Sequence, residues 1–162
     1  MRKRIIFCLG SNLGDKQKNL NLAEINLIQE LKLTNLKKSS ILQNKAMMLP
    51  DSPKEWDIDF LNIAISADID LLKFSPLKIL EICKNIEKKL GRQDRGKWAP
   101  REIDIDIAKI DDLKIDIDHK LTIPHPGIYD RDFFIKTISE IEKIDNKAEE
   151  NFDSQNINIS LG

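Results

Sequence analysis

Apolar and polar residues follow one another in short blocks that predict a mixture of strands and helices. The segment Arg4 to Leu9 is apolar and β-prone and runs into the turn Gly10-Ser11-Asn12, a pattern typical of a buried strand. From Asp15 to about Lys32, apolar residues recur at helical spacing. A second strand is expected over Leu36 to Leu42, and the polar stretch Gln43 to Glu55, interrupted by two prolines, predicts a mobile loop.

The second half of the chain repeats this alternation. Phe60 to Ala67 has one apolar face, while its other face carries the amide of Asn62, which predicts a strand. Ser75-Pro76 is a typical helix start and Gly91 a typical stop, with an apolar stripe between them. Three more elements are expected: strands over Ile103 to Ile107 and Leu121 to Pro124, and a helix from Asp130 to about Ile144.

The order of these elements predicts the fold class. Strand, helix, strand, strand, helix, strand is the ferredoxin-like βαββαβ order, an α+β fold with a mainly antiparallel sheet and flanking helices. A chain of 162 residues is the size of one domain. The polar, Asn-rich tail over 145–162 is open to two interpretations, a frayed terminus or a linker to a further domain.

Composition narrows the function classes. Apolar residues make up 41% and the net charge is −1, so the chain is neither disordered nor charged enough overall to hold nucleic acid or an anionic membrane. We find neither an apolar run long enough to span a bilayer nor a signal peptide. Cys8 and Cys83 lie among apolar neighbours without metal-ligand spacing, which favours buried thiols and a cytoplasmic location.

Asp104 and Asp106 are the first candidates for chemistry. Side chains alternate along a strand, so both carboxylates share a face, an arrangement that suits Mg²⁺ with its phosphate ligands. Asp-Ile-Asp also occurs at 57–59, 68–70 and 116–118, so the tripeptide alone means little. Only this copy follows a basic segment, 91–101, with four cations against one anion. Two interpretations stay open: a site for a metal-bound polyphosphate, or a solvated charged loop.

Other motifs are weaker. Gly91-x4-Gly96-Lys97 imitates a P-loop, but Trp98 replaces the metal-binding hydroxyl and the segment runs from helix to strand, so we exclude that site. Gly10-Ser11-Asn12-Leu13-Gly14 lacks the GxGxxG spacing and is better explained as a turn. No residue is marked as a hydrolase nucleophile.

Four blocks stand in an order seen in one family: Gly10 to Asp15, Phe60-Leu61-Asn62, Lys97 to Ile107, and Leu121 to Pro126. In these blocks the chain resembles the 6-hydroxymethyl-7,8-dihydropterin pyrophosphokinases, which transfer diphosphate from ATP to a pterin hydroxymethyl group in folate biosynthesis. The resemblance implies ATP and a pterin as ligands, Mg²⁺ as cofactor, and, in some members, fusion to or association with another folate-pathway enzyme.

The resemblance also implies a role for each matching residue. Asp104 and Asp106 would bind two Mg²⁺ ions, while Arg92 and Arg101 grip the triphosphate and Trp98 closes over the site. Phe60 and Phe133 would sandwich the pterin, and Asn62 would hydrogen-bond its polar edge. The remaining nucleotide contacts would come from Glu87, Lys97, Ile107, Lys120, Thr122, His125 and Arg131.

Some positions depart from the family pattern. Asn44-Lys45-Ala46-Met47-Met48 stands where a Thr-x-Pro-x-Gly-like segment is usual, and Ala99 replaces a glycine. Lys120 keeps the charge of the usual arginine without its bidentate fork. The rival interpretation, a ferredoxin-like module that binds nucleotide or RNA without catalysis, suffers from the scarcity of aromatic residues and the absence of net positive charge.

Overall fold

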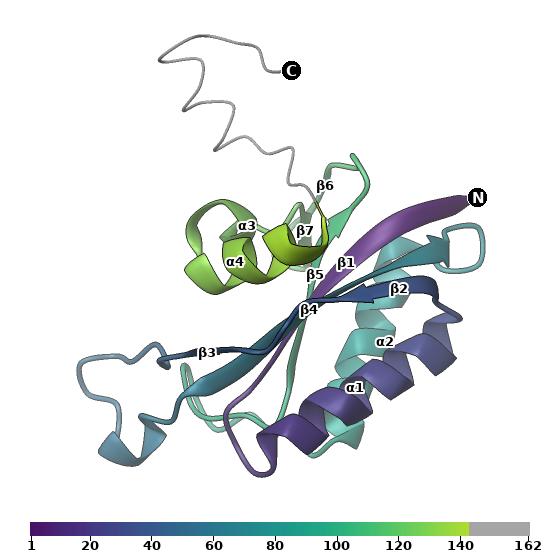
Figure 1. Cartoon of the computed structure of the whole chain (residues 1–162). Helices are drawn as coiled ribbons and strands as arrows, with labels where there is room; N and C mark the ends of the chain where they lie inside the picture. The colour runs from purple at the N-terminus through teal and green to yellow at the C-terminus, as the bar shows by residue number, and fades with distance from the viewer. Residues whose placement is uncertain (143–162) are drawn as a thin grey trace, which may run out of the picture.

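The computed structural model describes residues 1–142, which form an antiparallel sheet with helices on both faces (Figure 1). The elements, in chain order, are β1 (Arg2–Ser11), α1 (Lys16–Leu31), β2 (Thr34–Lys38), β3 (Leu42–Asn44), the 3₁₀ turn η1 (Lys54–Trp56), β4 (Phe60–Asp70), α2 (Pro76–Lys89), β5 (Asp104–Ile110), β6 (Ile115–Ile117), β7 (Leu121–Ile123), α3 (Gly127–Asp130) and α4 (Asp132–Ile141).

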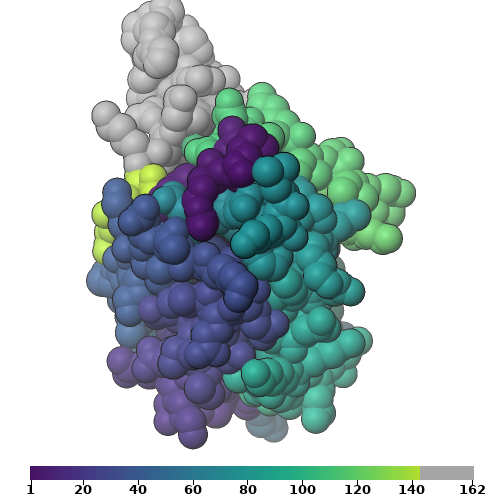
Figure 2. All heavy atoms as spheres, turned by 90° about the vertical axis from the view of Figure 1, so that its right-hand side faces the viewer, coloured from purple at the N-terminus to yellow at the C-terminus, as the bar shows by residue number. Residues whose placement is uncertain are grey.

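The strand order confirms the predicted fold. The main sheet runs β2-β4-β1-β5, with β3 also paired to β4, and every pairing is antiparallel. Because β1, α1, β2, β4, α2 and β5 follow one another along the chain, the core is the ferredoxin-like βαββαβ unit. β6 and β7 form a separate hairpin, green in Figure 2, which projects beside the face that α1 and α2 form.

The two faces of the sheet carry different cores. The α1 and α2 face buries the larger one, to which β1 contributes Ile5, Phe7 and Leu9. The opposite face buries a smaller cluster, in which Ile6 and Cys8 of β1 meet residues of α3 and α4. This alternation along one strand is the two-residue period of side chains in a sheet.

Both long helices begin where the sequence predicts. Asp15 caps α1 by accepting a hydrogen bond from the Lys18 N–H at 3.1 Å. Ser75 caps α2 by accepting one from the Lys78 N–H at 3.2 Å, and Pro76 takes the first helical position. Gly91 follows α2 with φ of +104°, a conformation that favours glycine and ends the helix.

Two predicted elements differ in the structure. The strand expected over Leu36 to Leu42 is broken into β2 and β3, because Ser39 turns its side chain to accept a hydrogen bond from the Ala64 N–H at 2.9 Å. The helix expected from Asp130 begins at Asp132 as α4, since Arg131 has extended backbone, and the short α3 just before it was not predicted. The end of that helix and the tail over 145–162 lie outside the described residues.

Smaller differences concern short segments. No sequence pattern indicated β6, and the loop predicted over 43–55 includes the end of β3 and the start of η1. Among the helices of the described part, none has the length and apolarity needed to cross a membrane.

Candidate functional site

The candidate site is the part of one sheet face that the C-terminal helices leave uncovered. α4 packs over Ile6, Ala64 and Ala108, one residue from each of the strands β1, β4 and β5. On the same face, two or more positions further along these strands, lie Gly10, Asn62 and Asp106. The alternation of side chains therefore places a glycine, an amide and a carboxylate side by side at the edge of the helical layer.

A cavity opens over these residues. Its lining includes members of the expected metal, phosphate and pterin sets, namely Phe60, Asn62, Trp98, Arg101, Asp104, Asp106, Arg131 and Phe133. These residues come from β4, β5, the loop before β5, and the start of α4. The fold thus brings together residues that lie up to 73 positions apart in the sequence, from Phe60 to Phe133.

The cavity is lined by aromatic rings and by the amide of Asn62. Gly10 has no side chain, and an added Cβ would lie 2.8 Å from the Asn62 Oδ1 and 3.3 Å from the Phe60 ring. The Phe133 ring packs edge-on against Phe134, with ring centroids 5.0 Å apart. A flat heterocycle with hydrogen-bonding groups at its edge suits such a lining.

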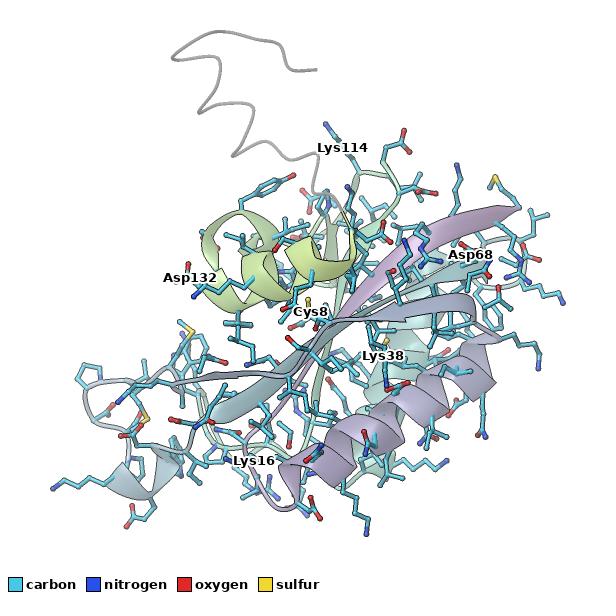
Figure 3. The ribbon with its side chains drawn as sticks, viewed as in Figure 1. Cys8, Lys16, Lys38, Asp68, Lys114 and Asp132 are labelled. Carbon is cyan, nitrogen blue, oxygen red and sulfur yellow. The ribbon has the colours of Figure 1, made fainter. Side chains whose placement is uncertain are left out.

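The structure adds lining residues that we did not predict. Asn44, Lys45 and Met47 come from the segment that departs from the family pattern, and the Asn62 amide donates a hydrogen bond to the Asn44 Oδ1. Cys8 lies on the floor beneath α4 (Figure 3). Burial raises the pKa of the Cys8 thiol well above its usual value, so the thiol is neutral. For Asn44, Lys45 and Met47, the only indication in the sequence was that their segment departs from the family pattern. Nothing in the sequence indicated that Cys8 would line the cavity.

Asp104 and Asp106 project from β5 into this cavity, as the alternation predicted. Burial, together with the charges of Asp104 and Glu87, raises the pKa of Asp106 well above its usual value, while Arg131 and Arg92 oppose the shift. A cation between these carboxylates would offset their mutual repulsion.

His125 lies beside this pair. Its Nε2 is 3.9 Å from the Asp106 Oδ1, and its Nδ1 accepts a hydrogen bond from the Gly127 N–H at 2.9 Å. That bond favours the neutral tautomer with the proton on Nε2, facing the carboxylate. Burial and the charge of Arg131 lower the pKa of His125, which also favours the neutral ring.

A second cavity adjoins the first and is strongly basic. It lies between α2 and the segment that precedes β5, and Ala99 and Arg101 line both cavities. Its cations include Arg92 and Arg95 from the predicted basic loop, and also Lys84 and Lys88 of α2, which the sequence did not single out. Such a cavity can hold a polyphosphate chain.

Glu87 and Arg92 line the second cavity, and Arg92 contacts Asp104, which lines the first. The Arg92 Nη1 lies 2.8 Å from the Glu87 Oε2 and 3.1 Å from the Asp104 Oδ1. The same Glu87 oxygen accepts a hydrogen bond from the Ile105 N–H at 2.7 Å. Burial raises the pKa of Glu87, whereas the Ile105 bond and Arg92 lower it.

Asn12 gives the Gly-Ser-Asn turn a structural role. Its side chain is fully buried, donates to the Ile58 carbonyl at 3.0 Å and accepts from the Arg101 N–H at 2.9 Å. Its own N–H donates to the Arg101 carbonyl at 3.2 Å. Asn12 therefore anchors the ends of both loops that flank the cavities, which supports the interpretation of this motif as turn chemistry.

Five of the expected nucleotide residues lie outside both linings: Lys97, Ile107, Lys120, Thr122 and His125. The expectation for Ile107 needs a correction: its side chain packs in the core under α1 and α2 and lines neither cavity. Along β5 the Ile105 N–H points away from β1, and alternation directs the main-chain groups of Ile107 the same way. Its contribution to a nucleotide site would come from the main chain.

Asp104 and Asp106 suit Mg²⁺ that has further ligands from water or phosphate. Within residues 1–142, no group of three or more His, Cys, Asp or Glu side chains is placed to hold a metal ion. Two aspartates on one strand face leave most coordination positions to water and phosphate oxygens, which is how Mg²⁺ is usually bound with nucleotides. The site therefore suits a metal that arrives with a phosphate ligand.

Comparisons with known proteins show to which family the chain is similar. Residues 6–143 match the family model described as 7,8-dihydro-6-hydroxymethylpterin-pyrophosphokinase (HPPK). The chain is 36% identical over 138 residues to a folate synthesis bifunctional protein of Chlamydia trachomatis, covering 85% of this chain and 30% of that protein. It is 37% identical over 134 residues to a 2-amino-4-hydroxy-6-hydroxymethyldihydropteridine pyrophosphokinase of Aquifex aeolicus, covering 83% of this chain and 77% of that one.

Solved structures support the fold. The crystal structure of Plasmodium falciparum HPPK-DHPS matches with a TM-score of 0.61 at 13% identity, over 98% of this chain and 47% of that one. The chain spans about 30% of the length of the bifunctional relatives it matches. From the extent of the family match and the identity to these relatives, the chain belongs to the 7,8-dihydro-6-hydroxymethylpterin-pyrophosphokinase family.

Proposed function

We propose that this chain transfers diphosphate from ATP to the hydroxymethyl group of 6-hydroxymethyl-7,8-dihydropterin and releases AMP, as a step of folate biosynthesis. One observation carries the proposal: a cavity with aromatic and amide lining opens at Asp104 and Asp106 and adjoins a basic cavity. An enzyme that joins a flat heterocycle to a metal-bound polyphosphate needs these two compartments and a carboxylate pair where they meet.

The reaction requires positioning more than covalent help. The hydroxymethyl oxygen attacks the β-phosphorus in line and loses its proton, while the bond from that phosphorus to the oxygen bridging the α-phosphorus breaks. Phe60 and Phe133 would hold the pterin ring between them, with Asn62 fixing its edge. Arg92 and Arg101 would bind phosphate oxygens and offset the charge that develops on them. We assign no general base.

Asp104 and Asp106 are the proposed Mg²⁺ ligands, and we propose two ions. When bound, Mg²⁺ supplies positive charge that offsets the charge of the phosphates. Trp98 lines the first cavity, in which we propose that the pterin binds, and would help to exclude water. Lys97 lies over the Trp98 ring, with its Nζ 5.7 Å from the ring centroid. The proposed nucleotide contacts are Glu87, Lys97, Lys120, Thr122, His125, Arg131 and the main chain of Ile107.

The cellular location and the association with other enzymes are also proposals. Free, buried Cys8 and Cys83 suit a reducing cytoplasm. Several relatives are bifunctional folate synthesis proteins, so we propose that this domain is fused to, or associates with, another enzyme of that pathway. The reading frame around the gene would test the fusion.

The direct test measures AMP release from Mg-ATP with and without the pterin. We expect AMP only when the pterin is present, and a loss of about 100-fold or more in Asp106→Ala. Asp116→Ala is the matched control, because this aspartate belongs to another Asp-Ile-Asp copy, on the exposed surface of the β6–β7 hairpin. Pterin-independent AMP release, or equal losses in both variants, would refute the proposal.

A further inference from the structure

The position beside Asp104 is already taken by a cation. The Arg92 guanidinium contacts Asp104 at 3.1 Å and Glu87 at 2.8 Å through a single nitrogen, Nη1. The two carboxylates come from different elements, β5 and α2, and the guanidinium joins them. Arg92 thus contacts the same Asp104 carboxylate that we propose for Mg²⁺.

Glu87 explains why a cation is held here before any ligand binds. The Glu87 side chain is almost completely buried, and the Ile105 N–H is its only neutral partner among the hydrogen bonds of the described residues. A buried carboxylate is costly unless it is paired, and the Asp104 carboxylate adds further negative charge at 3.1 Å from the same nitrogen. One guanidinium therefore neutralises part of the charge of two neighbouring carboxylates.

The backbone fixes where this guanidinium starts. The Arg92 N–H donates to the Glu87 carbonyl at 3.0 Å and the Gly91 N–H donates to the Lys88 carbonyl at 3.0 Å, the pair of bonds that defines a Schellman motif. Gly91, with φ of +104°, makes this turn possible. Because the main chain is held to the end of α2, any movement of the guanidinium away from Asp104 is a rotation of the side chain.

We propose that Arg92 is the resident counter-ion of Asp104 and leaves it only when metal and nucleotide bind together. The phosphates then offer Arg92 new anionic partners in the basic cavity that it lines, while Asp104 becomes available to the metal. The protein consequently binds Mg²⁺ with ATP rather than before it. This inference rests on the proposed metal role of Asp104.

The test uses Mn²⁺ alone, with no nucleotide, and follows its binding to the full chain by electron paramagnetic resonance. We expect Arg92→Gln to bind Mn²⁺ about tenfold more tightly than the wild type, because the competing cation is gone. The same variant should bind a non-hydrolysable ATP analogue more weakly, because it lacks a phosphate partner. Adding Asp104→Asn to the Arg92→Gln variant should abolish the gain in Mn²⁺ affinity.

Arg95→Gln is the matched control, since it removes the same charge from the same loop. Arg95 pairs with Glu102 at 2.8 and 3.0 Å rather than with Asp104, so the Mn²⁺ affinity of this variant should equal that of the wild type. Arg92→Lys keeps a cation and should bind Mn²⁺ like the wild type. This variant shows whether the positive charge at position 92 is what lowers the Mn²⁺ affinity. Circular dichroism of each variant establishes that it is folded.

The outcomes separate this inference from the proposed function. If Arg92→Gln binds Mn²⁺ no more tightly than the wild type or Arg95→Gln, Arg92 does not compete with the metal and the inference is overturned. If Asp104→Asn takes up Mn²⁺ with nucleotide as well as the wild type does, the metal role of Asp104, and with it the proposed function, fails instead.

Discussion

At the scale of single residues, the absence of a side chain at Gly10 leaves room for Asn62 and Phe60 in the cavity that we propose for the pterin. A Cβ at this position would come within 2.8 Å of the Asn62 Oδ1. We expect Gly10→Ala to displace the Asn62 amide and weaken pterin binding about tenfold, the effect of one lost hydrogen bond. Isothermal titration with the pterin measures this, and nucleotide affinity, which should change less than about twofold, is the internal control. Unchanged pterin affinity would contradict the proposed role of Asn62.

Asn12 carries the second prediction at this scale. Asn12→Ala removes the side-chain bonds to Ile58 and Arg101, so we expect a stability loss of about 1–3 kcal/mol and a raised KM for both substrates. Asn26 of α1 is the matched control. It is also buried, it is hydrogen-bonded to Leu22 and Lys89, and it lies on the α1 and α2 face of the sheet. Asn26→Ala should lose comparable stability in chemical denaturation and keep both KM values. Equal KM effects in the two variants would show that Asn12 acts through stability alone.

At the scale of elements, the two loops that flank the cavities touch each other. Trp56 of η1 lies against Gly96, where an added Cβ would be 3.3 Å from the indole. We expect a bound ATP analogue to raise the pterin affinity through this contact between the loops, and we expect Trp56→Ala to reduce that gain by about threefold to tenfold. Glu55→Ala in the same turn serves as control. Titrating pterin with and without the analogue gives the coupling, and an unaltered ratio in Trp56→Ala would refute the idea.

The C-terminal helix is a second element whose placement matters. Beyond its last turn, Glu142 accepts hydrogen bonds from Arg4 at 3.1 Å and from Ser66 at 2.8 Å, which ties α4 to β1 and β4. We expect Glu142→Ala to cost about 1–3 kcal/mol in the free energy of unfolding, because a partly buried Arg4 loses one of its two carboxylate partners, the other being Asp68. Glu81→Ala, which breaks the exposed pair with Lys78, should cost at most about 0.5 kcal/mol. Urea unfolding of both variants would show whether the two losses differ.

Elements were predictable from the sequence where a local pattern decides them. The Ser75-Pro76 start and Gly91 stop of α2 and the alternation in β5 act within a few residues, and both elements formed as expected. The break between β2 and β3 depends on Ser39 bonding Ala64, 25 residues away, and no local pattern carries that information. The site follows the same rule. Alternation placed Asp104 and Asp106 on one face, but the bond between Asn12 and Arg101 spans 89 residues and was not predictable.

At the scale of the whole molecule, buried apolar side chains are distributed unequally between the two faces of the sheet. The α1 and α2 face buries the larger apolar core, whereas α3 and α4 cover only part of the other face with a small cluster. Segments with less buried apolar surface open more easily, so the layer that carries Phe133 is the less stable one. The binding side of the sheet is therefore the side that local opening affects first.

Hydrogen exchange tests this distribution. In the free protein we expect the amides of α4 to exchange at least about tenfold faster than those of α1, because opening α4 exposes only the small cluster. An ATP analogue and pterin together should slow exchange in α4 and leave α1 nearly unchanged, since ligands stabilise the states that bind them. Mass spectrometry of peptides from both helices gives the two rates. Equal protection of α1 and α4 in the free protein would mean that the layers open as one unit, and Phe133 would then be held as firmly before binding as after it.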